Sequence, residues 1–189
     1  MKAILAVLAG ALLLAGSGSA LAQDSKPSEH RTIAQVLDQS VTEVEKEFVP
    51  TAEAMPEDKY AFAPTTGEFK GVRTFAQQVK HVAAVNYMLA AAILEEKAPV
   101  DLGSENGPDS VKTKADVVKF LKDSFAYFHK AVSTITEANL LTPVKNPFGD
   151  EKTTRLSLST LNVGHAFNHY GQMVEYLRMN GIVPPASRQ

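Results

Sequence analysis

Two histidines four residues apart, His165 and His169, are the residues of this chain best suited to chemistry. On a helix this spacing places both side chains on one face, with Cβ atoms roughly 5–6 Å apart. Two neutral imidazoles held in this way can chelate one divalent cation, with Zn–N bonds of about 2.0–2.1 Å. A third ligand must come from another helix, and His81 is the best candidate. The sequence therefore predicts an open three-histidine metal site inside a helical bundle.

Side chains next to the histidine pair could support such a site. Asn168 and Gln172 lie near the same helical face and could orient a ligand imidazole. Tyr170 could supply a phenol, although a tyrosine in such a position usually packs in the core with a satisfied hydroxyl. His81 lies about two turns into its own helix. We expect the three rings to meet at one level if both helices enter the bundle from the same end.

Ordinary structural roles explain the same residues when each is taken alone. An isolated HxxxH pair on an amphipathic helix often packs or faces water. A single histidine beside an apolar stripe is usually a hydrogen-bonded core residue, and this applies to His81. Gly164 and Gly171 flank the pair, at a cost of roughly 1 kcal/mol each relative to alanine. Either a close approach of a backbone or ligand, or a tight helix crossing, would explain these glycines.

Other titratable groups are weaker candidates. His129 could rim a pocket, but a structural role is the simpler interpretation, and His30 lies too near the start of the domain to be a ligand. Glu95 and Glu96 read as a solvated face rather than as an acid–base pair. The sequence has neither a GxSxG nucleophile motif nor a glycine-rich phosphate loop.

Apolar residues recur every three or four positions in four long segments, and this spacing predicts four amphipathic helices. Thr74 and Gln77 form a capping box at the start of the second segment. Pro50 is expected to end the first helix, Ser157 or Ser159 to cap the fourth, and Gly181 to follow its end. The expected helices span residues 29–48, 73–97, 113–138 and about 157–180.

The connections between these segments are long. Within residues 51–72, a short helical turn is expected at residues 55–60, and residues 140–156 read as irregular, with no strand of convincing alternation. Four amphipathic helices with such connections predict an all-α fold, a four-helix bundle with long crossover connections.

Residues 1–22 have the pattern of a cleaved signal peptide. A lysine at position 2 precedes an apolar stretch, and Ala20 and Ala22 form a small-x-small cleavage site. The apolar stretch falls short of the roughly 20 residues that span a bilayer. We therefore expect an exported protein, periplasmic or secreted, whose single domain is residues 23–189, with no stable membrane insertion after cleavage.

The composition of the chain argues against some classes of partner and excludes some kinds of chemistry. Without residues 1–22 the chain has 18 basic and 21 acidic residues, a formal charge of −3. This near balance argues against nucleic acid as a partner. The chain has no cysteine, which rules out disulfides, thiolate ligands and a cysteine nucleophile. A small-molecule substrate or ligand is the expected partner, and the apolar fourth helix is compatible with a homodimer.

Three stretches of the chain resemble the DinB-like superfamily of four-helix-bundle metalloenzymes. Residues 55–60, MPEDKY, are similar to the connector after the first helix of that family. Residues 73–81, RTFAQQVKH, resemble the segment that ends in the family's first metal histidine. Residues 164–172, GHAFNHYGQ, resemble its HxxxHxGQ signature.

This resemblance implies a shared metal site at His81, His165 and His169. The superfamily includes thiol-dependent S-transferases such as bacillithiol transferases, so the implied activity is that of a metal-dependent hydrolase or a thiol S-transferase. Tyr170 stands where the family often has arginine, and the characterised transferases use cytosolic thiols. A non-catalytic metal- or small-molecule-binding bundle, or an interaction module without metal, is the alternative.

The histidine set does not specify one metal. Imidazole ligands suit several divalent transition metals, and availability often decides among them. We expect zinc or nickel first, with iron, manganese and copper also compatible.

Overall fold

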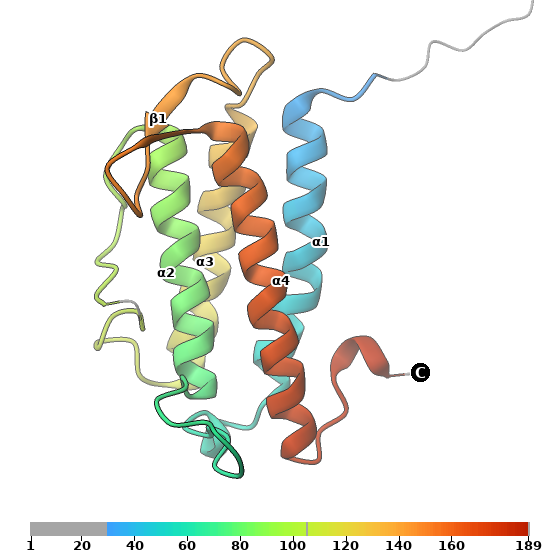
Figure 1. Ribbon diagram of the computed structural model, residues 1–189. Helices are drawn as coiled ribbons and strands as arrows, with labels where there is room; N and C mark the ends of the chain where they lie inside the picture. Colours follow the sequence, from blue (N-terminus) through green and yellow to red (C-terminus); the bar gives the residue numbers. More distant parts are fainter. Residues whose placement is uncertain (1–29, 105, 189) are drawn as a thin grey trace, which may run out of the picture. The chain divides into compact units, whose positions relative to one another are not determined.

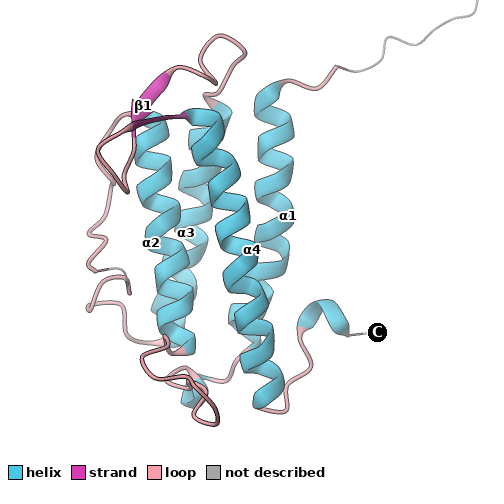
Figure 2. Ribbon diagram, in the orientation of Figure 1, coloured by secondary structure: helices cyan, strands magenta, loops and turns pink. Residues whose placement is uncertain are grey.

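Four long helices make up most of the part of the chain that the structure describes (Figures 1 and 2). The computed structural model describes residues 30–104 and 106–188, and the predicted signal peptide lies outside them. The long helices are α1 (Ile33–Ala54), α2 (Phe75–Leu94), α3 (Lys114–Ser133) and α4 (Arg155–Met179). The short elements are the 3₁₀ helices η1 (Glu57–Lys59) and η2 (Pro185–Ser187) and the strands β1 (Pro143–Lys145) and β2 (Lys152–Thr154). The all-α bundle is confirmed.

Threonine side chains start all four long helices of the described chain. Thr32, Thr74 and Thr113 each form a capping box with the residue three positions later, as was predicted for Thr74. The predicted cap of α4 at Ser157 or Ser159 is wrong, because the cap is Thr154, whose hydroxyl accepts a hydrogen bond from the Ser157 N–H at 3.1 Å. The helix starts earlier because β2 ends directly at its cap.

Helix α1 continues past Pro50, contrary to the expectation that this residue would end it. A proline inside a helix costs about 3 kcal/mol through its missing N–H and its ring clash. The turn after it is held by tertiary contacts, since Thr51 and Ala52 are fully buried and the Tyr60 hydroxyl donates to the Ala52 carbonyl at 2.6 Å. Packing in the bundle therefore outweighs the local preference.

Helix α3 ends at Ser133, five residues before the predicted end. A polar turn replaces its last turn, because Asn139 accepts a hydrogen bond from the Thr136 N–H and donates one to the Thr134 carbonyl. The short helical turn expected at residues 55–60 is present as the 3₁₀ helix η1, and Gly181 follows α4 in a left-handed conformation with φ +73°, as expected.

The α3–α4 connection contains a small hairpin where irregular structure was expected. Strands β1 and β2 pair antiparallel over three residues each, with Pro143 opposite Thr154 and Lys145 opposite Lys152. Strands this short carry no readable alternation, so the sequence pattern did not reveal them.

Helices α2 and α4 run antiparallel, so they do not enter the bundle from the same end, which was the condition set for the three rings to meet at one level. Gln78, at the start of α2, meets Gln172 in the second half of α4, whereas Ile93, near the end of α2, meets Arg155 at the start of α4. Figure 1 shows the same arrangement, with the α2–α3 connection running back along the length of the bundle.

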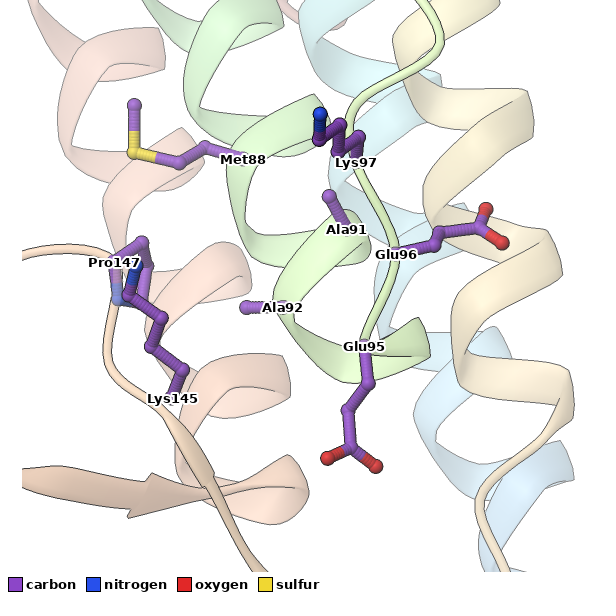
Figure 3. Close-up of a pocket in the computed structure, with 8 residues that line it drawn as sticks. All are labelled: Met88, Ala91, Ala92, Glu95, Glu96, Lys97, Lys145 and Pro147. Carbon is purple, nitrogen blue, oxygen red and sulfur yellow. The ribbon is translucent and has the colours of Figure 1, made fainter.

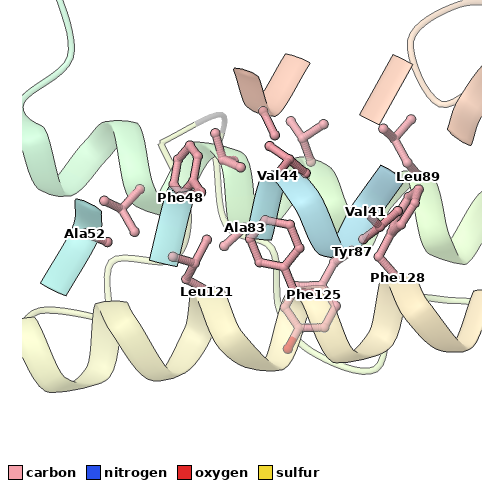
Figure 4. Packing of buried hydrophobic residues seen from close by; sticks show 14 of the residues in the cluster. Val41, Val44, Phe48, Ala52, Ala83, Tyr87, Leu89, Leu121, Phe125 and Phe128 are labelled. Carbon is pink, nitrogen blue, oxygen red and sulfur yellow. The ribbon is translucent and has the colours of Figure 1, made fainter. Parts of the chain in front are cut away.

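The core is mainly apolar, but it also buries polar side chains, among them a cluster of Asn86, Ser124 and Asn162. Phe48 of α1 packs against Phe125 of α3 with ring centroids 6.4 Å apart (Figure 4). In the cluster, Asn162 of α4 donates to Asn86 of α2 at 2.7 Å, and Asn86 donates to Ser124 of α3 at 3.1 Å. No helix among the described residues has the length and apolar character that crossing a membrane requires.

Candidate metal centre

The structure brings the three predicted histidines together between α2 and α4. His81 comes from the second turn of α2, and His165 and His169 lie one turn apart on α4. Their ring centroids are 4.5–5.0 Å apart, and one ring nitrogen from each lies within 4.8 Å of the others. The Nε2 atoms of His81 and His165 face each other at 3.1 Å. The antiparallel direction of the helices produces this meeting, since it places the early part of α2 beside the later part of α4.

A chain of side-chain amides orients His169. Its Nδ1 donates to Oε1 of Gln78 at 2.5 Å, and Gln78 in turn donates to Oε1 of Gln172 at 2.9 Å. Gln172 then donates to Oδ1 of Asn168 at 3.2 Å. Because Nδ1 of His169 carries the proton, its Nε2 keeps a lone pair that can bind a cation.

Burial keeps the α4 histidines neutral. Burial, followed by the neighbouring charges of His81 and Arg73, lowers the pKa of His165 to about 4. Burial and the same neighbours, with His165 added, lower the pKa of His169 to about 3. Both imidazoles are therefore neutral at pH 7, and the neutral form is the one that binds metal ions.

The residues present fit a divalent transition metal. A tetrahedral zinc with bonds of about 2.0–2.1 Å spaces its ligand atoms by roughly 3.4 Å, so small side-chain rotations bring three nitrogens within 4.8 Å into position. His165 supports this fit, because its Nδ1 is buried without a hydrogen-bond partner. A neutral imidazole that is not held by a hydrogen bond at Nδ1 can rotate toward a shared cation. Three imidazole ligands also leave room for a further ligand in the coordination sphere.

Of the three side chains predicted to support the site, two lie behind His169 and the third, Tyr170, does not. Gln172 and Asn168 belong to the amide chain behind His169, although both are exposed. The Tyr170 hydroxyl instead donates to Glu47 of α1 at 3.0 Å, and this bond fastens α4 to α1 rather than orienting a histidine.

Gln78 is the residue that sequence reasoning missed. It is 2 % exposed and makes the direct contact with His169. A polar side chain one turn before His81, on a helix face that is otherwise apolar, was the available signal, but glutamine at that position also reads as part of an ordinary helix start.

The remaining candidates lie away from the centre. His129 of α3 is held between Asp38 and Glu45 of α1, at 2.5 and 3.1 Å, which makes it a structural residue as predicted. Neither a close backbone approach nor a tight helix crossing within the described chain explains the two α4 glycines, because a Cβ atom added at Gly164 or Gly171 would meet nothing within 4 Å. Both glycines are exposed.

The model of the DinB superfamily matches residues 40–173, most of the described chain. This protein belongs to the DinB superfamily. The match includes all three histidines and the amide chain behind them. A search of curated proteins found no match.

Solved structures of DinB-like proteins have the same fold. A DinB-like protein from Bacillus cereus is 16 % identical, with a TM-score of 0.63 over 79 % of this chain and 93 % of that one. A DinB-like protein from Bacillus subtilis is 18 % identical, with a TM-score of 0.61 over 82 % of this chain and 99 % of that one. At these identities the likeness shows the DinB-like fold alone.

Proposed function

We propose that this DinB-superfamily protein is an exported metalloenzyme, a metal-dependent hydrolase or thiol S-transferase, with His81, His165 and His169 as its metal ligands. The observation that supports the proposal is the convergence of three imidazole nitrogens from two helices within 4.8 Å. Zinc and nickel are the first candidates for the metal.

The chain itself contributes a preorganised ligand set. Gln78 holds His169 in the tautomer that presents Nε2, and burial keeps His165 and His169 unprotonated. A divalent cation bound there would polarise an electrophile or lower the pKa of a bound water or thiol. Both hydrolysis and thiol transfer use this chemistry, and small molecules are the substrates that a site between two helices admits.

One observation favours a second candidate, a metal- or small-molecule-binding bundle without turnover. The groups hydrogen-bonded behind His169 are amides, Gln78, Gln172 and Asn168. Amides do not titrate, so they orient ligands without acting as a general acid or base.

Metal analysis of the protein purified from its native compartment tests the metal site. We expect about one equivalent of metal per chain in the parent and a loss of at least tenfold in metal affinity in His81→Ala and in His165→Ala. His129→Ala is the matched control, because that histidine lies between α1 and α3. Unchanged metal content in both ligand variants would show that the assignment is wrong.

Turnover assays separate the two candidates. The metal-loaded protein is offered simple esters, amides and thiol–electrophile pairs. Metal-dependent product formation that is lost in His165→Ala supports the enzyme. Saturable metal binding without product in any of these assays supports the binding bundle.

Export is part of the same proposal. It is supported by the lysine, apolar stretch and small-x-small site in residues 1–22. Intact-mass analysis of protein from the periplasm or medium is expected to give a chain that begins at Gln23. A full-length chain confined to the cytoplasm would contradict it.

A further inference from the structure

The centre adjoins an apolar hollow of about 220 Å³ that is lined by α2. Its wall includes His81, so the hollow lies beside one of the proposed ligands. The rest of the wall is mainly apolar, with Ala84, Val85 and Met88 from α2, Leu102 from the α2–α3 connection and Phe148 from the hairpin loop. A volume of this size accepts a group larger than benzene, which fills an apolar cavity of about 150 Å³ in another protein.

A second hollow of about 650 Å³ continues along the same helix. The two hollows share Met88, and Pro147 in the second precedes Phe148 in the first. Figure 3 shows Met88 about one turn of α2 before Ala91 and Ala92, with Lys145 and Pro147 beside them. At 100° per residue the α2 positions from 81 to 92 that line the hollows fall on one helix face.

The far end of this face is charged. Glu95, Glu96, Lys97 and Lys145 line the second hollow beyond the alanines. From His81 to Glu95 the helix rises roughly 21 Å, at 1.5 Å per residue. The face is therefore long enough for an extended molecule with an apolar middle.

The wall opposite α2 is fastened in place near His81. Gly107 has φ +76°, and a Cβ atom there would lie 2.7 Å from Cβ of Lys80, so the connection lies directly on the helix. The Lys80 ammonium donates to the carbonyls of Pro108 at 3.0 Å and Val111 at 3.3 Å. The α2–α3 connection is therefore anchored to α2 next to the residues that line the apolar hollow.

A polar hollow of about 540 Å³ lies on the other side of the centre, lined in part by Arg73, Gln77 and Asn106. It reaches Gln78 and Gln172 of the amide chain, whereas the apolar hollow reaches a histidine ring directly. Of these two hollows, the apolar one is the one whose wall includes a proposed metal ligand.

We infer that the substrate of this centre has an extended apolar portion that lies along α2 from His81 past Met88, with its reacting polar group at the metal. This inference rests on the proposed function. It assigns the substrate to a class, small molecules with an extended apolar body of several carbons.

A series of straight-chain hydroxamates tests the inference, because the hydroxamate group chelates zinc and only the alkyl tail varies. Zinc uptake is measured first, and the affinities of acetohydroxamate to octanohydroxamate are then measured by titration calorimetry. We expect the affinity to rise two- to fourfold with each added methylene group, as for burial of a methylene in an apolar site. Equal affinities across the series would overturn the inference and leave the metal site standing. Absence of zinc uptake would overturn both.

Met88→Trp tests the path of the tail by filling the junction of the two hollows. We expect it to weaken octanohydroxamate at least tenfold and leave acetohydroxamate unchanged. Met179→Trp is the matched control, since Met179 is exposed at the end of α4. Phe148→Ala provides a second variant at an exposed loop position, with Phe69→Ala as its control, and is expected to weaken the long probes selectively. Equal effects on short and long probes in both variants would contradict the proposed path.

Discussion

The Nδ1 atom of His169 lies 2.5 Å from Oε1 of Gln78, a contact between residues 91 positions apart in the chain. It links the start of α2 to the later part of α4 at the level of the histidines. The amide of Gln78 is itself held by Gln172, so its oxygen points at the ring rather than away from it. One buried amide therefore determines which nitrogen of His169 is available to a cation.

Gln78→Leu is expected to lower zinc affinity 10- to 100-fold, because groups that orient a ligand histidine typically contribute that much. Competition with a chromophoric chelator measures it. Gln78→Glu keeps an acceptor for the Nδ1 proton and should restore affinity to within a few-fold of the parent. Gln39→Leu, on the exposed face of α1, is the control. An unchanged affinity in Gln78→Leu would show that His169 is oriented by something else.

Gly164→Ala and Gly171→Ala are each expected to stabilise the protein by roughly 0.5–1 kcal/mol, because glycine inside a helix loses more backbone entropy on folding than alanine. Open space around both positions means that the added methyl group meets no clash. Urea unfolding with EDTA present measures the change without any contribution from metal. Destabilisation by either substitution would indicate that the glycine is required for a contact outside this chain.

His129 should make the stability of the α1–α3 contact depend on pH. Hydrogen bonds to Glu45 and Asp38 raise the pKa of His129 above its usual 6.5. A histidine whose pKa is higher in the folded than in the unfolded state contributes its full stabilisation of the folded state below pH 6.5. This stabilisation is lost as the pH rises through the folded-state pKa. His129→Gln should therefore lose more stability relative to the parent at pH 6 than at pH 9.

Urea unfolding of both proteins at the two pH values, with EDTA present, measures this difference. Asp38→Asn together with Glu45→Gln should remove the same pH dependence while leaving the histidine in place. A difference between parent and His129→Gln that is the same at pH 6 and pH 9 would contradict the assignment.

The buried pair Asn86 and Asn162 should behave as one unit. Asn86→Leu leaves the side-chain N–H of Asn162 without its acceptor in a site that water does not reach, whereas Ser124 still donates to the Leu121 carbonyl, and the change should cost about 1–3 kcal/mol. Adding Asn162→Leu removes a group that is already unpaired, so the double variant should lose less than the two single losses combined. Urea unfolding of all four proteins completes the cycle. Simple additivity would show that the hydrogen bond contributes no coupling.

Local sequence was enough to place the helices and one half of the site. Thr74 and Gln77 form the predicted capping box because the groups involved lie within three residues of each other. The spacing of His165 and His169 gave the shared face of α4 for the same reason. The predicted end of α1 was wrong because the local effect of Pro50 is opposed by the burial of Thr51 and Ala52. The sequence around the proline does not show that these two residues are buried.

The histidine spacing on α4 and the capping box that starts α2 were determined by the sequence itself, since both depend on neighbours within about one turn. Only the tertiary structure decided that His81 meets His165, 84 residues away, and that Gln78 stands behind His169. These contacts follow from the antiparallel direction of α2 and α4, and that direction is set by how four helices and their long connections bury a common core. Periodicity along a single helix carries no record of which helix lies opposite or which way it runs.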